Sequence, residues 1–159
     1  LIGRFVGAGD MQRANQVISS GLILSLSYSS ILALLFLIFR TELVEVFSTG
    51  DEYFAEISTL ASTMMLGLVT YMLADAVILI SGGVLRGAGD TRWIMFTSTS
   101  LHWFMLIVQY FVIVQWDMDP LVSWWVFVIM LLSLAVCYAT RLYRGRWRQP
   151  ERLARVMQD

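Results

Sequence analysis

The hydrophobic positions of the chain gather in four long runs, separated by short polar segments. The runs cover approximately residues 17–39, 57–85, 93–115 and 121–143. Each is at least as long as the roughly 20 apolar residues that cross a bilayer as a helix. None shows the sustained alternation of a strand, and a helix satisfies its own backbone groups in lipid. The pattern predicts an all-α fold, a polytopic membrane helix bundle with four transmembrane helices.

The composition supports a membrane protein and offers little for catalysis. Hydrophobic residues make up 58% of the chain and charged residues only 14%, against roughly 25% in ordinary globular proteins. Mean hydropathy is +0.70, and the single Cys137 excludes an internal disulfide. The sequence contains no metal-ligand cluster, nucleophile–base pair or nucleic-acid motif, so we expect no enzyme, no cofactor and no nucleic-acid partner.

Positive charge lies on alternate connections between the runs. The chain has no lysine, and ten of its eleven arginines fall on one side, while the connections 40–56 and 116–120 are acidic. The positive-inside rule places the arginine side in the cytoplasm. We therefore expect a multi-pass protein of the cell inner (plasma) membrane with its C-terminus in the cytoplasm. The basic tail, residues 144–159, is either a topology anchor or a site for anionic lipid headgroups.

The phrase GAGD occurs twice, eighty residues apart. A glycine-rich loop before a helix can bind phosphate, but the dinucleotide fingerprint needs a further glycine and the Walker motif needs a lysine. We interpret the phrase as a short turn between helices, in which Gly87 or Gly89 takes a positive φ and Asp10 and Asp90 cap the helices that follow. Gly83, four residues before Gly87, is expected to help neighbouring helices approach closely.

One acidic residue, Asp75, lies inside a predicted membrane span. It precedes Arg86 by eleven residues, about 16 Å along a helix, which places it near mid-depth. A charge there costs roughly 2.5–3.5 kcal/mol and typically marks an ion or proton pathway. We interpret Asp75 as a functional carboxylate, against the alternative of a structural carboxyl bonded to neighbouring hydroxyls. Tyr71, one turn earlier, lies on the same face.

The third span carries a polar stripe of Ser98, His102 and Gln109 at helical spacing. We expect the stripe to face the protein interior, where these three residues are candidates for lining a cavity. His102 is either an interior hydrogen-bonding residue or part of a proton relay. Methionines of the second span, Met64 among them, either line an adaptable drug surface or pack in the core. The six tryptophans, mostly near span ends, are interpreted as interfacial anchors.

The stretch YMLADAVILISGGVLRGAGDTR resembles the multidrug and toxic compound extrusion (MATE) family. Its members carry an Asp-Ala pair in the fourth helix of the C-terminal half, followed by a glycine-rich LRG turn and Asp-Thr. The opening GRFVGAGD resembles the family's turn between the second and third helices of a half. The resemblance covers essentially the whole chain. It implies that residues 1–159 form the last four of twelve helices, in the C-lobe of a transporter, with the N-terminal eight helices as their partner.

The resemblance also implies an activity: secondary active efflux of cationic or amphipathic drugs, in exchange for Na⁺ or H⁺. In the cation-coupled bacterial branch, the matching aspartate and a tyrosine four residues before it belong to the C-lobe cation site. These map onto Asp75 and Tyr71, which makes Asp75 a candidate Na⁺ ligand; a partner glutamate lies on a helix outside this chain. The third span reads LHWFMLIVQYF, without that branch's Tyr-Trp and downstream proline, so the coupling ion stays open.

Three other functions remain as alternatives. A lipid-linked oligosaccharide flippase of the same superfamily would need a basic central cavity, and the four spans contain no interior arginine. A non-transporting membrane scaffold subunit would leave Asp75 without a coupling role. A complete four-helix transporter that works as a dimer would need no further helices.

Overall fold

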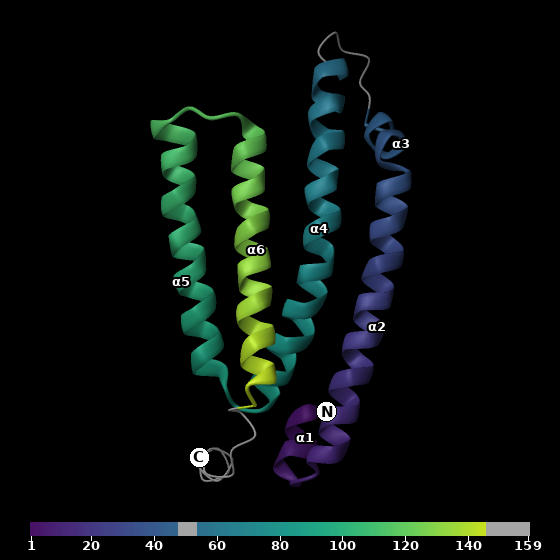
Figure 1. Cartoon of the computed structure of the whole chain (residues 1–159), viewed down its shortest axis with the longest axis vertical. Coiled ribbons are helices and arrows are strands. Elements are labelled where there is room, and N and C mark those ends of the chain that lie inside the picture. Colours follow the sequence, from purple (N-terminus) through teal and green to yellow (C-terminus); the bar gives the residue numbers. More distant parts are fainter. Residues whose placement is uncertain (48–53, 146–159) are drawn as a thin grey trace.

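The computed structural model describes residues 1–47 and 54–145, which fold almost entirely into helices (Figure 1). No strand occurs in these two segments, and the all-α prediction is confirmed. Four helices are long and two are short: α1 (Ile2–Gly7), α2 (Met11–Ile38), α3 (Arg40–Glu45), α4 (Phe54–Gly87), α5 (Thr91–Tyr110) and α6 (Pro120–Tyr143).

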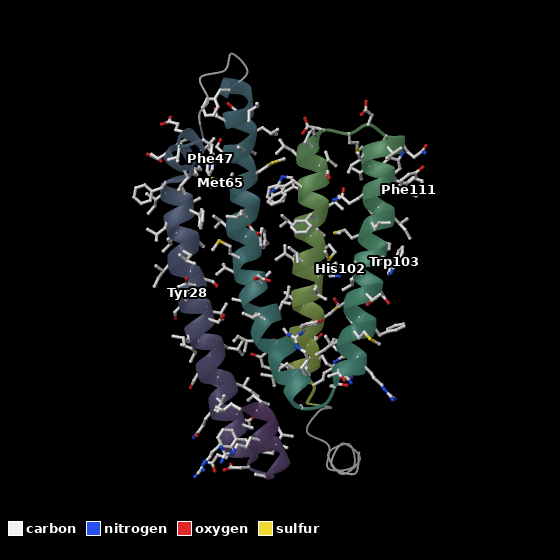
Figure 2. The ribbon with its side chains drawn as sticks, turned by 180° about the vertical axis from the view of Figure 1, so that it is seen from behind. Tyr28, Phe47, Met65, His102, Trp103 and Phe111 are labelled. Atoms are coloured by element: carbon white, nitrogen blue, oxygen red, sulfur yellow. The ribbon has the colours of Figure 1, made fainter. Side chains whose placement is uncertain are left out.

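The four long helices correspond to the four predicted spans. By length and composition each can cross a membrane, over Met11–Ile38, Ile57–Gly87, Thr91–Gln115 and Pro120–Tyr143. Large apolar side chains on the two outermost helices are exposed, with Tyr28 on α2 and Trp103 on α5 both at 63% (Figure 2). Such faces suit contact with lipid or with further membrane helices. The chain is a multi-pass membrane protein.

Helix α4 is the central element, because it packs against α2 on one side and α6 on the other, and α5 packs against α6. The buried residues gather where the N-terminus, the two glycine turns and the end of α6 come together (Figure 1). At the opposite end α4 and α6 diverge (Figure 1). The bundle is therefore densely packed at one end and more loosely packed at the other, which we call the open end. The core cluster consists of Ile2, Val6, Ala14, Ile18, Val84, Leu85, Ala88, Ile94, Leu134, Tyr138 and Leu142.

Both copies of the repeated phrase end a helix in the same way. Gly9 and Gly89 adopt left-handed conformations, with φ of 73° and 80°. In both copies the N–H of the following aspartate donates to the carbonyl five residues earlier, at 2.9 Å. This arrangement is the Schellman motif, which closes a helix at a residue with positive φ. The predicted turn is confirmed for both copies.

The aspartate side chains of the two GAGD copies make different contacts. Asp10 caps α2 as predicted, since its carboxylate accepts a hydrogen bond from the backbone N–H of Arg13 at 3.0 Å. This cap starts the helix at Met11 rather than at residue 17. Asp90 was expected to cap α5 in the same way, and that prediction is wrong. Its side chain makes no capping hydrogen bond, because the carboxylate points to Arg141 of α6.

The expectation for the glycines of α4 is correct at Gly87 and wrong at Gly83. A Cβ on Gly87 would lie 3.3 Å from the Cβ of Ile2, so this glycine lets α1 approach α4 closely. Among the described residues, no atom would lie within 4 Å of a Cβ on Gly83. The difference arises because α1 is short and reaches only the last turn of α4.

The third span keeps its predicted length but not a uniform helix. After Tyr110 the backbone winds more loosely, into a π-helical turn over Phe111–Gln115. The N–H of Trp116 donates to the carbonyl of Phe111 at 3.0 Å, which closes the wider turn. Asp117 follows with φ of 45° and turns the chain toward α6.

The charge asymmetry predicted from the connections can be followed only in part. Of the arginines between residues 1 and 145, Arg40 lies at the open end, where α3 begins, and the others lie at the packed end (Figure 1). The rest of the basic tail and the acidic residues Asp51 and Glu52 are outside the described residues.

Candidate functional site

Asp75 lies on a face of α4 that neither neighbouring helix covers. The residues before and after it, Ala74 and Ala76, are 6% and 5% exposed, because α4 packs between α2 and α6. The Asp75 side chain is exposed, and within residues 1–47 and 54–145 it makes no hydrogen bond or ion pair. The carboxylate can therefore accept a proton or a cation from the uncovered side.

Tyr71, one turn before Asp75, connects this face of α4 to α6. Its ring meets the rings of Trp124 and Phe127 edge to face, with centroid distances of 6.2 and 6.0 Å. Aromatic pairs favour this geometry. Trp124 and Phe127 are stacked on each other at 5.6 Å, so the three rings form one cluster beside the helix turn that carries Asp75. We call Tyr71, Trp124 and Phe127 the aromatic cluster.

Sequence reasoning missed two members of this cluster, since it interpreted Trp124 as an interfacial anchor and did not single out Phe127. The indole Nε1 of Trp124 donates a hydrogen bond to the backbone carbonyl of Met64 in α4, at 2.9 Å. The indole lies against Gly67, where a Cβ would overlap Nε1. The isolated Gly67 in a long apolar helix is the sequence signal that could have indicated a large side chain packed there.

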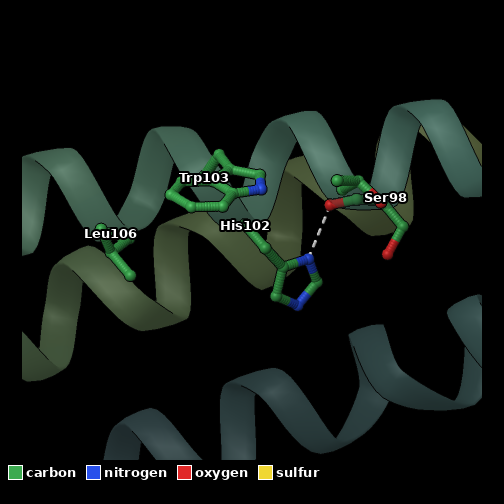
Figure 3. Close-up of a pocket in the computed structure, with 5 residues that line it drawn as sticks. Ser98, His102, Trp103 and Leu106 are labelled. Atoms are coloured by element: carbon green, nitrogen blue, oxygen red, sulfur yellow. Dashed lines mark hydrogen bonds between the residues drawn. The ribbon is translucent and has the colours of Figure 1, made fainter.

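His102 and Ser98 line a shallow hollow of about 340 Å³ on α5, together with Thr99, Trp103 and Leu106 (Figure 3). The His102 Nδ1 lies 2.7 Å from the Ser98 carbonyl oxygen. Because a carbonyl can only accept, Nδ1 carries the hydrogen, and Nε2 of the neutral ring remains as an acceptor. The bond is internal to α5, and within residues 1–47 and 54–145 His102 makes no hydrogen bond to another helix.

Gln109 occupies a different place from the other two members of the polar stripe. Its amide Nε2 donates to the Ser123 carbonyl and its Oε1 accepts from the Ser123 hydroxyl, both at 2.8 Å, which joins α5 to α6. Gln109 also lines a second hollow, of about 490 Å³, bordered by Met64, Trp124 and Phe127. The stripe thus divides between two hollows: Ser98 and His102 line one, and Gln109 lines the other.

The described residues contain no group of three or more His, Cys, Asp or Glu side chains placed to hold a metal ion. Hard cations take several oxygen ligands. Asp75 supplies one carboxylate, so a Na⁺ ion bound there would require further oxygen ligands.

Comparisons with known proteins give a consistent family assignment. The model of the MatE family matches residues 1–111. A protein named multidrug resistance protein MdtK, from Yersinia pseudotuberculosis serotype O:1b (strain IP 31758), is 28% identical over 99% of this chain and 34% of its own length. The probable multidrug resistance protein NorM of Pasteurella multocida (strain Pm70) is 28% identical over 95% of this chain and 32% of its own length. The chain therefore spans about a third of these relatives. No solved structure matches it significantly.

Proposed function

The chain belongs to the MatE family, and we propose that it supplies the last four of twelve helices of a transporter that exports cationic or amphipathic drugs in exchange for Na⁺ or H⁺. Two relatives named as multidrug resistance proteins match nearly the whole chain over a third of their own length, which supports this division. The observation that carries the proposal is Asp75, an exposed carboxylate without a partner among the described residues and within a span able to cross the membrane.

The proposed coupling follows from the charge of Asp75. Removing an ionised carboxylate from water costs much more free energy than removing a carboxylate that is protonated or bound to a cation. Binding of H⁺ or Na⁺ at Asp75 therefore favours the conformation in which this face of α4 is closed to water. Loss of the cation favours the conformation in which the site is hydrated or holds a cationic drug. A ligand can shift a conformational equilibrium only by such a difference in affinity.

In the proposed orientation the protein lies in the cell inner membrane with the packed end of the bundle toward the cytoplasm. The gathering of arginines at that end supports the orientation. The open end, where α4 and α6 diverge, then faces outward.

The test is Asp75→Asn in the intact transporter, with ethidium efflux measured in cells that lack other drug exporters. Asparagine keeps the shape of the side chain and removes its charge, so we expect efflux to slow about tenfold or more. Asp117→Asn is the matched control, because Asp117 lies in the α5–α6 turn with φ of 45°, a conformation that asparagine tolerates. Efflux by Asp75→Asn at the rate of the unmodified transporter, at equal protein level, would refute the proposed role.

A further inference from the structure

The turn between α4 and α5 carries positive charge that no described residue balances. Arg86, Arg92 and Arg144 are exposed, and none of these three side chains forms a hydrogen bond or an ion pair with another described residue. The aspartate of the turn, Asp90, is buried and bound to Arg141. It is therefore not available to the exposed guanidinium groups, and this corner of the bundle has a net positive surface.

Two of these arginines extend from the joint between the turn and the end of α6. The ion pair of Asp90 with Arg141, at 2.7 Å, ties the turn to the last turn of α6 (Figure 1). Arg92 follows Asp90 by two residues, and Arg144 follows Arg141 by three. The two exposed guanidinium groups therefore start from the same joint, although they belong to different helices.

The third arginine, Arg86, reaches the same place from the last turn of α4. A Cβ on Gly82 would lie 3.4 Å from the Nη2 atom of Arg86 and 3.1 Å from the ring of Tyr138 in α6. The guanidinium of Arg86 thus lies toward the final turns of α6. We call Arg86, Arg92 and Arg144 the arginine corner.

The arginine corner lies at the level of a membrane surface. The spans formed by α4, α5 and α6 each have an end within one residue of one of these arginines. Met95 and Phe96 are exposed on α5, three and four residues beyond Arg92, so they continue the same face as apolar surface toward the bilayer interior. A phospholipid has the same order, with a negative phosphate group above apolar acyl chains.

The first GAGD copy has a different charge balance. Its aspartate, Asp10, is partly exposed and lies 3.3 Å from the Nε atom of Arg13, so these two charges compensate each other. Of the arginines before residue 17, only Arg4 has no ion pair among the described residues. The second copy differs because Arg141 holds its aspartate away from the surface.

We propose that the arginine corner binds the phosphate group of an anionic phospholipid, in the leaflet that borders the packed end of the bundle. Guanidinium groups donate paired hydrogen bonds to phosphate oxygens. Three of them together favour a headgroup with a net negative charge over a zwitterionic headgroup. The inference goes beyond the proposed function, since it requires neither drug export nor a coupling role for Asp75.

The experiment measures lipid binding to the purified intact transporter by native mass spectrometry at fixed ionic strength. Phosphatidylglycerol is the anionic lipid, and phosphatidylcholine is the zwitterionic one. Arg92→Gln and Arg144→Gln are each expected to weaken phosphatidylglycerol binding about fivefold, as expected for the loss of one basic residue near an anionic surface. Phosphatidylcholine binding is expected to stay within about twofold. Both arginines are exposed, so neither substitution is expected to impair folding.

Arg13→Gln is the matched control, because Arg13 is an exposed arginine at the same end of the bundle and is paired with Asp10. It is expected to change phosphatidylglycerol binding by less than about twofold. Equal weakening by Arg13→Gln and Arg92→Gln would overturn the inference, since it would indicate diffuse attraction to all positive charge at this end. Unchanged binding in both Arg92→Gln and Arg144→Gln would also overturn it and identify these arginines as topology anchors only.

Discussion

Arg141, near the end of α6, binds Asp90 in the turn between α4 and α5. Its Nε and Nη2 atoms lie 2.8 and 2.7 Å from the same carboxylate oxygen, and the two side chains are only 10% and 8% exposed. The guanidinium also lies 5.1 Å from the centre of the Trp93 ring, in cation–π geometry. One buried ion pair thus joins three helices at the packed end of the bundle.

Asp90→Asn is expected to destabilise the protein by roughly 3–5 kcal/mol, because it leaves the buried Arg141 charge without its counter-ion. Thermal unfolding of the intact transporter in detergent, followed by circular dichroism, measures the loss. Adding Arg141→Met removes the unpaired charge, and we expect the double variant to recover part of the stability.

The matched control for this prediction is Asp10→Asn, at the same position of the first GAGD copy. Asp10 is only partly buried and caps α2, and asparagine caps nearly as well, so the cost is expected to stay below about 0.5 kcal/mol. Equal losses of unfolding free energy for Asp10→Asn and Asp90→Asn would show that the Asp90–Arg141 pair stabilises the protein no more than the exposed cap does.

Gly67→Ala is expected to destabilise the contact between α4 and α6 by about 1–3 kcal/mol, because the added Cβ overlaps the Trp124 indole. Unfolding in detergent measures this, and Trp124→Phe in the same chain is expected to restore part of the loss by making room. Gly83→Ala is the control in the same helix, with open space around the new Cβ. It is expected to be neutral or stabilising by up to about 1 kcal/mol, and a loss as large as that of Gly67→Ala would contradict the packing argument.

Gly89→Ala is expected to lower the free energy of unfolding by about 1–2 kcal/mol, because the left-handed conformation at φ of 80° is unfavourable for alanine. Gly9→Ala is expected to cost a similar amount, since the two Schellman motifs have the same hydrogen bonds. Asparagine at position 89 is expected to cost less than alanine. Gly7→Ala serves as the control, because Gly7 is helical and its Cβ would meet no atom of the described part of the chain within 4 Å. A Gly7→Ala variant as unstable as Gly89→Ala would argue against backbone strain.

The sequence was sufficient for the features that depend on neighbouring residues. Apolar runs of more than 20 residues located the four spans, because lipid requires long apolar helices. The GAGD phrase located both turns, since a glycine with positive φ and a following aspartate make a local motif. The resemblance to the MATE family is confirmed by the family match over residues 1–111.

The contacts that position side chains could not be predicted, because they join residues far apart in the chain. Asp90 was expected to cap α5, and its partner Arg141 is 51 residues away. Trp124 binds the carbonyl of Met64, 60 residues earlier, and no local pattern indicates that pairing. The roles of Asp75 and Tyr71 remain predictions, since they depend on the bound cation and the further helices that the proposed function requires.

The uneven packing of the bundle has a mechanical consequence. The core cluster and the Asp90–Arg141 pair fix α4, α5 and α6 to one another at one end. Toward the other end α4 and α6 lie further apart, and the hydrogen bond from Trp124 to the Met64 carbonyl bridges them. Helices of 20 residues or more extend about 30 Å from this fixed point. A rotation of α6 against α4 by about 10° about the packed end would displace the far ends by about 5 Å, and it would break the hydrogen bond from Trp124 to the Met64 carbonyl. In this geometry a small rotation at the packed end would produce a larger change in the distance between the far ends of α4 and α6, and the Trp124–Met64 hydrogen bond opposes that change.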